Sequence, residues 1–144
     1  MRLSFEQATP SELDEIATWR YEPPYDFYDG DQEPVVNPER FFMARDGDGK
    51  LVGFLYFEPR GDVLEYGLGL RPDLNGCGLG LELVRAGLEF GRDRFRPGGV
   101  VLSVAAFNDR ARIVYERAGF VVTGRHVRNF PKWGDVEFLD MEEQ

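Results

Sequence analysis

The stretch that decides the fold runs from Leu70 to Glu82 and reads Leu-Arg-Pro-Asp-Leu-Asn-Gly-Cys-Gly-Leu-Gly-Leu-Glu. Glycine stands at positions 76, 78 and 80, directly before a segment with helical periodicity. Such a loop turns tightly and presents several backbone N–H groups where a helix dipole begins. It therefore predicts a site for a diphosphate. The alternative is purely steric, because glycines also collect in turns that bind nothing.

The segments on either side of this loop predict a parallel βαβ unit. Residues 63–70 alternate as a strand, with Glu65 and Gly67 on one face. Residues 79–90 carry apolar side chains at helical spacing. The run from Val100 to Ala105 is almost wholly apolar, which is typical of a strand buried on both faces. The glycine loop then lies at the carboxyl end of the first strand, where open α/β sheets bind their ligands.

Turn signals, capping groups and hydrophobic periodicity predict the other elements. In chain order these are a strand at 2–7, a helix from Thr9 to about Trp19, a hairpin of 41–45 and 51–57, a helix from Asn108 ended by Gly119, and a closing hairpin of 120–127 and 136–141 around a connection at 129–135. This order belongs neither to a dinucleotide-binding fold nor to a barrel. We expect one mixed α/β domain over residues 1–144.

Composition excludes several classes of function. The net charge of −9 and the pI near 4.6 argue against nucleic acid or an anionic membrane as the partner. A single cysteine cannot form an internal disulfide, and one histidine makes a Cys/His zinc cage implausible, so we expect no metal site. The chain has neither an apolar signal core nor a run of about 18 apolar residues. We expect a soluble cytoplasmic protein.

The segment from Trp19 to Glu33 combines aromatic rings, carboxylates and two prolines. Aromatic faces beside carboxylates can hold an amine or another cation. The segment therefore predicts a binding site for an amine, without a choice between a small cationic amine, an aminoglycoside-like molecule and a peptide N-terminus. The alternative is that the rings cover the core while the acids are solvated. The candidate substrate-binding residues are Trp19, Glu22, Tyr25, Asp26 and Tyr28.

A second motif follows the buried strand and reads Asn108-x-x-Ala111-x-x-x-Tyr115-x-x-x-Gly119-Phe120. With Leu70-x-Pro72 and the glycine loop, it resembles the GNAT superfamily of acyl-CoA-dependent N-acetyltransferases over roughly residues 40–141. The resemblance implies a GNAT-like α+β fold. In this fold a central, mostly antiparallel twisted sheet of about six to seven strands contains one parallel βαβ pair and has flanking helices. It also implies an enzyme that moves an acetyl group from acetyl-CoA directly to an amine.

The same resemblance implies where acetyl-CoA binds. The family's loop signature is Gln/Arg-x-x-Gly-x-Gly/Ala; Gly78 and Gly80 match it, whereas Asn75 stands in place of the Gln or Arg. In such enzymes the loop holds the diphosphate mainly through backbone N–H groups, and the first βαβ strand pairs with the pantetheine arm. The implied cofactor-binding residues are Leu68, Gly69, Leu70, Asn75, Gly76, Cys77, Gly78, Leu79, Gly80, Asn108 and Tyr115.

Two residues are candidates for the proton transfers. Tyr115 resembles the family's tyrosine that protonates the departing thiolate, and a phenol of pKa ~10 can donate at neutral pH. The alternative for Tyr115 is a core aromatic. Glu65 is the candidate base, because it shares a strand face with Gly67 and Gly69 and would face the thioester. Glu65 could also act as a base through a water molecule, or it could be an ordinary surface carboxylate with no catalytic role.

Other interpretations are weaker. Cys77 as a nucleophile is disfavoured, because no histidine is near it in sequence and the family forms no acyl-enzyme. His126, in a predicted strand, is expected to be exposed or packed at an edge. A nucleotide-binding enzyme would need a different glycine spacing. A non-catalytic acyl-CoA sensor stays open, although Asn108 and Tyr115 disfavour it. A homodimer is a further expectation, because closing hairpins often pair in this family.

Overall fold

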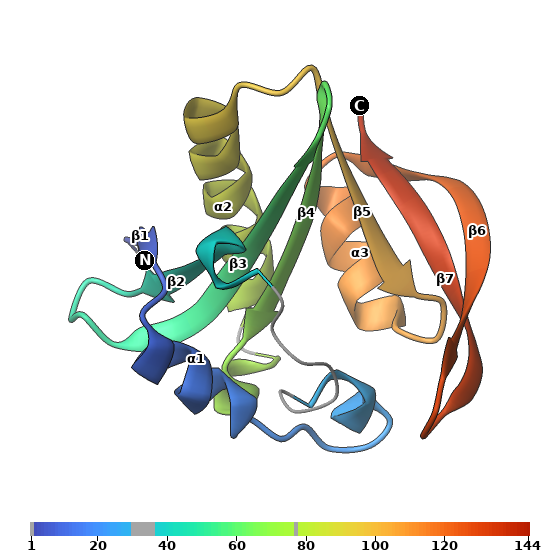
Figure 1. Ribbon diagram of the computed structural model, residues 1–144, viewed down its shortest axis with the longest axis horizontal. Helices are drawn as coiled ribbons and strands as arrows, with labels where there is room; N and C mark the ends of the chain where they lie inside the picture. Colours follow the sequence, from blue (N-terminus) through green and yellow to red (C-terminus); the bar gives the residue numbers. More distant parts are fainter. Residues whose placement is uncertain (1, 30–36, 77) are drawn as a thin grey trace.

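The computed structural model describes residues 2–29, 37–76 and 78–144, and its centre is a seven-stranded sheet of order β1-β2-β3-β4-β5-β7-β6 (Figure 1). The strand pairs of this sheet are antiparallel except β4 with β5, which is parallel. The strands are β1 (Ser4–Gln7), β2 (Phe41–Arg45), β3 (Leu51–Arg60), β4 (Val63–Leu70), β5 (Gly99–Ala105), β6 (Phe120–Phe130) and β7 (Gly134–Glu143).

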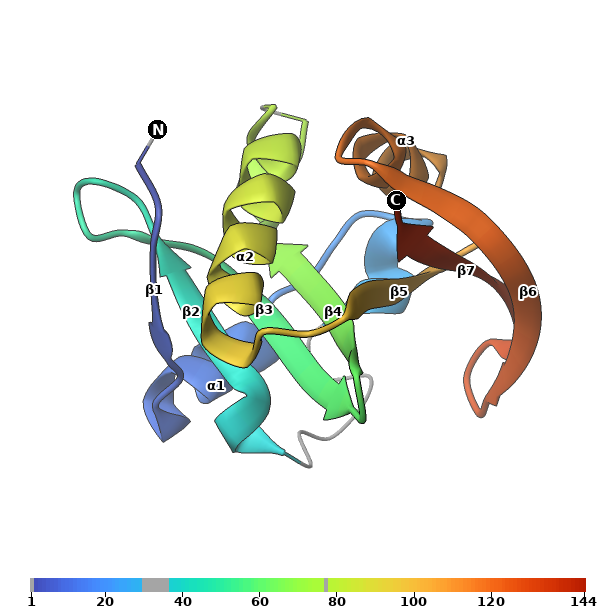
Figure 2. The ribbon, with the colours of Figure 1, turned by 90° about the horizontal axis from the view of Figure 1, so that it is seen from above.

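Helices cover both faces of the sheet. The α-helices are α1 (Pro10–Ala17), α2 (Leu79–Phe95) and α3 (Asp109–Arg117), and the short 3₁₀ turns are η1 (Tyr25–Tyr28), η2 (Pro38–Arg40) and η3 (Pro72–Leu74). Figure 2 shows α2 and α3 on one side of the sheet and α1 on the other. The main core lies under α2, where Leu83 and Val84 are buried against strand residues that include Leu55 and Tyr66. Among the described residues, no helix is both long and apolar enough to cross a membrane.

Local sequence signals explain where the helices begin and end. Thr9 caps α1 and forms a capping box with Glu12. Asn108 caps α3, because its Oδ1 accepts the backbone N–H of Ala111 at 3.1 Å. Gly119 ends that helix with a φ of 104°. Gly78, the N-cap of α2, has a φ of 79°, which favours glycine at that position.

The parallel pair β4–β5 is joined at one end only. Paired positions run from Val63 opposite Gly99 to Glu65 opposite Val101. Beyond Glu65 the two strands diverge, and Figure 1 shows them separating toward their carboxyl ends, with η1 beside the opening. The structure therefore contains a wedge-shaped opening between the carboxyl-terminal halves of β4 and β5.

The predicted order of elements is confirmed, and the differences concern burial and length. The prediction that β5 is buried on both faces is wrong, because Val101 is half-buried and Ser103 is exposed. That face of β5 is buried only at its carboxyl end, where Ala105 packs with Phe27. The closing hairpin is longer than predicted, since β6 reaches Phe130 and β7 begins at Gly134. Helix α1 ends at Ala17, two residues before the predicted limit.

Candidate active site

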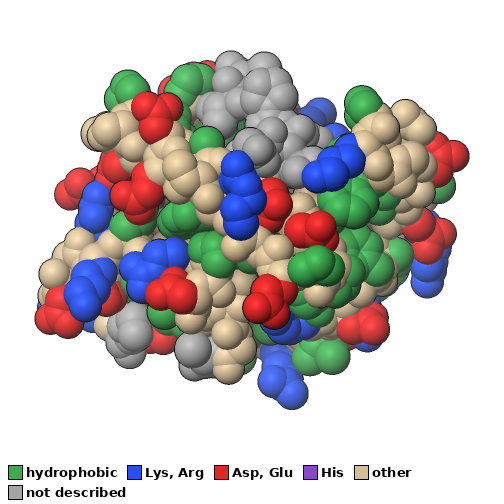
Figure 3. Space-filling model, turned by 90° about the horizontal axis from the view of Figure 1, so that it is seen from below, with side chains coloured by type: hydrophobic (Ala, Val, Ile, Leu, Met, Phe, Trp, Pro, Cys, Tyr) green, Lys and Arg blue, Asp and Glu red, His purple; other side chains and the backbone are tan. Residues whose placement is uncertain are grey.

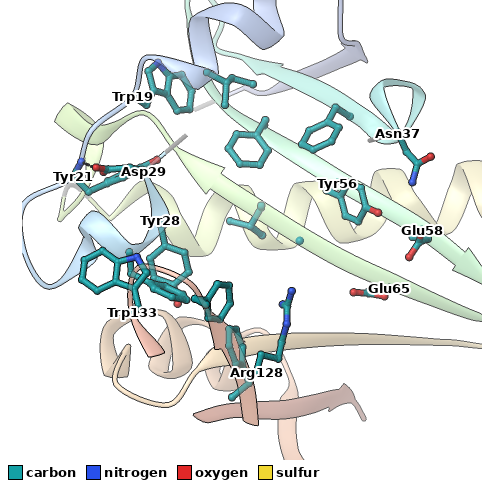
Figure 4. A pocket seen from close by; sticks show the side chains of 18 of the residues that line it. Trp19, Tyr21, Tyr28, Asp29, Asn37, Tyr56, Glu58, Glu65, Arg128 and Trp133 are labelled. Carbon is teal, nitrogen blue, oxygen red and sulfur yellow. Dashed lines mark hydrogen bonds between the residues drawn. The ribbon is translucent and has the colours of Figure 1, made fainter. Parts of the chain in front are cut away.

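A cavity of about 480 Å³ lies on the α1 side of the sheet, beside the opening between β4 and β5. Its floor comes from β3 and β4, one wall from the segment of Trp19 to Asp29, and the opposite wall from the hairpin of β6 and β7 (Figure 4). Hydrophobic side chains gather in a patch on this face, with charged side chains at its margin (Figure 3). The lining contains ten aromatic residues, Trp19, Tyr21, Phe27, Tyr28, Phe41, Phe54, Tyr56, Phe130, Trp133 and Phe138.

Strand β4 contributes Glu65, Gly67 and Leu68 to the cavity, starting at the residue where its pairing with β5 ends. The register fixes which backbone groups face the opening. Because the N–H of Arg71 donates to the carbonyl of Val52 in β3, the odd-numbered residues of β4 pair with β3. The backbone groups of Leu68 and Leu70 therefore point the other way, toward the opening.

The surroundings of Gly67 and Gly69 in β4 differ in the room that they leave for a side chain. A Cβ on Gly67 would lie 3.7 Å from the Cβ of Tyr56, which is ordinary contact, so this position has room and forms part of the cavity floor. A Cβ on Gly69 would lie 2.4 Å from the ring of Phe54. The lack of a side chain at Gly69 is therefore explained by close packing, because the ring of Phe54 covers that position.

Glu65 belongs to a surface ion-pair network. Its Oε2 lies 2.6 Å from Nε of Arg60, and the other arm of the same guanidinium is 2.7 Å from Glu58. About a third of the Glu65 side chain is exposed (35%), so water reaches the carboxylate. Burial raises the pKa of the neighbouring Tyr56, and the negative charges of Glu58 and Glu65 raise it further. Glu65 therefore lines the cavity with one carboxylate edge already bound to Arg60.

Tyr115 and Asn108 come from the other side of the opening. Tyr115 is half-buried in α3, where its ring meets Phe120 edge to face, and it packs against the main core. Burial raises the pKa of Tyr115 well above its ordinary value, and the neighbouring Tyr28 raises the pKa further. Its phenol therefore keeps its proton at neutral pH. Asn108 is buried, with 8% of its surface exposed.

The glycine loop precedes α2 as predicted. Gly76 and Gly78 both have positive φ, 82° and 79°, whereas Gly80 lies within the first turn of the helix. No described side chain caps the N-terminus of α2, so its first N–H groups point out of the helix toward the loop. The Asn75 side chain turns back to the carbonyl of Pro72 at 3.4 Å. Cys77 lies outside the described residues.

The candidate substrate residues separate into two groups. Trp19 and Tyr28 line the cavity. Glu22 is exposed, and Tyr25 lies under the guanidinium of Arg110 at 4.1 Å. The backbone carbonyl of Asp26 accepts the N–H of Asp29 in the turn η1. Glu22, Tyr25 and Asp26 are not among the residues that line the cavity.

Sequence reasoning missed the far wall of the cavity. Arg128, Phe130, Trp133 and Phe138 come from the closing hairpin, and Figure 4 shows the Arg128 side chain directed into the cavity. The one available signal was the density of rings around the turn at 131–133. His126 lies on the same hairpin, where its ring stacks on Phe138 at 5.4 Å and its Nδ1 is 2.9 Å from Asp140. Among residues 2–29, 37–76 and 78–144, no cluster of three His, Cys, Asp or Glu side chains could hold a metal ion.

Comparisons with known proteins give this site its context. Mycothiol acetyltransferase of Streptomyces coelicolor is 43% identical over 101 residues, which are 67% of this chain and 31% of that protein. The enzyme of the same name from Corynebacterium efficiens is 44% identical over 86 residues, 57% of this chain and 28% of that protein. The chain thus spans about a third of the length of these curated relatives.

Solved structures share the fold. A chimera of spermidine N-acetyltransferase SpeG from Vibrio cholerae and hSSAT superimposes with a TM-score of 0.77 at 22% identity, over 99% of this chain and 96% of that chain. A sequence model described as the acetyltransferase (GNAT) family matches residues 6–120. The predicted family and fold are confirmed, and acetyl transfer is the activity in the names of these relatives. The chain belongs to the acetyltransferase (GNAT) family.

Proposed function

We propose that this chain transfers an acetyl group from acetyl-CoA to an acceptor that carries a single amino group on an apolar or aromatic body. The observation that carries the proposal is the position of the cavity. It is lined by β4 from Glu65 to Leu68, where the pairing between β4 and β5 has ended. An amine in this cavity would meet a thioester lying in the wedge-shaped opening.

Three features support acetyl-CoA as the donor. The backbone groups of Leu68 and Leu70 face the opening, where a pantetheine arm would pair with them. Gly76 and Gly78 turn the chain so that the uncapped N-terminus of α2 follows directly. Uncapped N–H groups at the positive end of a helix dipole bind phosphate. Because Asn75 is turned toward Pro72, the backbone would supply most of the diphosphate contacts.

Bound acetyl-CoA supplies an acetyl thioester, and this chain would supply the proton transfers. Tyr115 would hold the proton that the departing sulfur takes, because its raised pKa keeps the phenol protonated. Glu65 would accept a proton from the acceptor amine, directly or through a water molecule, since its carboxylate lines the cavity and is partly exposed. The two groups approach the opening from different elements, β4 and α3.

The charges around the cavity favour an acceptor with one amino group. Asp29 accepts the backbone N–H of Tyr21 at 2.7 Å, and both Glu58 and Glu65 bind Arg60. Arg128 adds a second positive charge to the lining. The described carboxylates are thus largely compensated, while ten aromatic rings surround the space. One ammonium held against ring faces suits this environment better than a polyamine does.

An amine panel tests the proposal. The chain, with Cys77 replaced by serine to remove background thiol, is incubated with acetyl-CoA and one amine at a time, and CoA release is followed with a thiol reagent. The panel contains 2-phenylethylamine and tryptamine as aromatic monoamines, with spermidine and glucosamine for comparison. We expect kcat/KM at least about 10-fold higher for the aromatic monoamines than for spermidine.

Calorimetry with acetyl-CoA separates the ways in which the proposal can fail. Tight binding of acetyl-CoA without acetylation of any amine would favour the acyl-CoA sensor. Acetylation of spermidine or glucosamine in preference to the aromatic monoamines would keep the enzyme and overturn the proposed acceptor class.

A further inference from the structure

Tyr28 places a hydroxyl group inside the opening between β4 and β5. Its oxygen accepts the backbone N–H of Ala105, the last residue of β5, at 3.3 Å. The neighbouring Ala106 donates its own N–H to Glu137 on the β7 side, so the N–H of Ala105 points toward β4. The strands have diverged at this level, and the Tyr28 hydroxyl takes the place of the missing strand partner.

Asn108 provides a second hydrogen bond to the same hydroxyl. The Oδ1 of Asn108 is held by the backbone N–H of Ala111, so the NH2 group is the donor that the same side chain has for Tyr28. Burial raises the pKa of Tyr28, and the hydrogen bonds from Asn108 and Ala105 oppose this rise, as donors to the oxygen must. The Tyr28 oxygen therefore accepts from two donors.

A phenol oxygen with two accepted hydrogen bonds has its own O–H left to donate. The ring of Tyr28 lines the cavity, and 37% of the residue is exposed there, while its hydroxyl end is held by Ala105 and Asn108. Tyr115 lies close enough to Tyr28 for the Tyr28 phenol to raise the pKa of Tyr115. The site thus contains two phenols, one from α3 and one from η1, on the two sides of the same opening.

Tyr21 shows the contrasting arrangement. Its hydroxyl donates to the carbonyl oxygen of Leu70, the last residue of β4, at 2.6 Å. The proton of Tyr21 is therefore already used in holding β4, whereas the proton of Tyr28 is not used in its hydrogen bond with Ala105 of β5. The same short segment contacts the ends of both diverging strands, but only Tyr28 keeps an O–H group that can donate to another molecule.

We propose that Tyr28 is a further catalytic residue of this site, whose hydroxyl donates a hydrogen bond to the carbonyl oxygen of the acyl group that enters the opening. The inference rests on the proposed function. Tyr28 keeps its proton throughout: a bond forms between the amine nitrogen and the acyl carbon, and the carbon–sulfur bond breaks. Tyr115 gives its proton to the sulfur, and the base takes the proton from the amine. A donor placed in advance at such an oxygen stabilises the charge that develops on it.

The test replaces Tyr28 with phenylalanine, which keeps the ring and its contact with Phe27 at 5.1 Å. The matched control is Tyr66→Phe, which removes a buried tyrosine hydroxyl bonded to the carbonyl of Val84 at 3.0 Å, on the α2 side of the sheet. We expect Tyr28→Phe to lower kcat by at least about 10-fold, with the KM for acetyl-CoA changed by less than about 3-fold. Tyr66→Phe should lower the melting temperature with kcat changed by less than about 3-fold.

A spectroscopic measurement checks the contact without turnover. Infrared difference spectra of acetyl-CoA labelled with carbon-13 at the carbonyl report the hydrogen bonding of the bound thioester. We expect a lower carbonyl frequency on the wild-type chain than on Tyr28→Phe, and the wild-type frequency on Tyr66→Phe. Equal kcat and equal frequency in wild type and Tyr28→Phe would overturn the inference while leaving the proposed function intact. A wild-type chain that binds no acetyl-CoA would instead remove the proposed function and the inference with it.

Discussion

The ring of Phe54 covers Gly69 so closely that a Cβ there would lie 2.4 Å from the ring edge. Gly69→Ala should therefore displace Phe54 and cost about 1–3 kcal/mol of unfolding free energy, as overpacking usually does. Gly67→Ala is the matched control, since its Cβ would meet Tyr56 at 3.7 Å. We expect Gly67→Ala to keep its melting temperature and to raise the KM for the acceptor, because the added methyl group enters the cavity. Equal melting temperatures for the two variants would show that the Phe54 ring moves aside at no cost in stability.

Tyr115→Phe should lower kcat by about 100-fold, the usual contribution of a general acid. The dissociation constant of acetyl-CoA should change little, because the ring and its packing against Phe120 remain. Stopped-flow measurement of CoA release together with calorimetry of acetyl-CoA binding checks both expectations. Unchanged turnover in this variant would remove the acid role and leave Tyr115 as a core aromatic.

Glu65→Gln should lower kcat by at least about 10-fold if the carboxylate accepts the amine proton. The loss should become smaller with acceptors whose amines are less basic, because these are already neutral at the assay pH. Loss of the Arg60 contact should leave the melting temperature nearly unchanged, since the pair is exposed and screened by water. The matched variant is Glu58→Gln, which removes the other partner of Arg60; an equal loss of kcat in both would assign the effect to the ion-pair network rather than to a base.

Gly78→Ala should weaken acetyl-CoA binding and cost about 1–2 kcal/mol of unfolding free energy, because Gly78 has a φ of 79° at the N-cap of α2. Gly99→Ala provides the control. Gly99 has no atom within 4 Å of an added Cβ and no positive φ. Calorimetry of CoA and thermal denaturation of both variants make the comparison, and normal CoA affinity in Gly78→Ala would argue against a diphosphate in this loop.

Alkaline pH should destabilise the fold through its tyrosines. Burial raises the pKa of five of them in the native state, Tyr21, Tyr28, Tyr56, Tyr66 and Tyr115. In the unfolded chain the pKa is ~10, so the native state retains protons that the unfolded state releases. This stabilisation is complete below about pH 10 and decreases as the pH rises above it. Denaturant titrations at pH 8 and pH 11 should show the fall, and absorbance at 295 nm should show that phenolate forms later in the native chain.

Local signals in the sequence predicted most of the fold. The capping group at Thr9, the turn at 46–49 and the alternation of β4 each act over a few residues, so they can be read without knowledge of the rest of the chain. Burial of β5 was predicted wrongly from the same kind of signal. Its apolar run is compatible with cover on both faces, and the sequence of the strand does not show that Ser103 remains exposed.

The cavity depends on contacts between distant segments, and these were predictable only in part. Glu65 and Tyr28 were identified because strand alternation and aromatic density point to them. Arg128 and Trp133 were not, because they reach the cavity only through the register of β6 with β7 and the curvature of the sheet. The ion pair between Glu65 and Arg60 likewise forms only because the turn between β3 and β4 brings the two residues together.

The hydrogen bonds of Tyr21 to Leu70 and of Tyr28 to Ala105 also set a spacing along the chain. One hydroxyl is bonded to each of the two diverging strands, so the length of the segment between the two tyrosines matches the distance between the strand ends. Side chains of residues 22–27 can be exchanged to suit another acceptor without moving Tyr21 or Tyr28. A residue inserted or deleted between positions 22 and 27 would instead pull one hydroxyl from its strand. Diversification of the acceptor in this chain should therefore proceed by substitution within the segment and not by a change in its length.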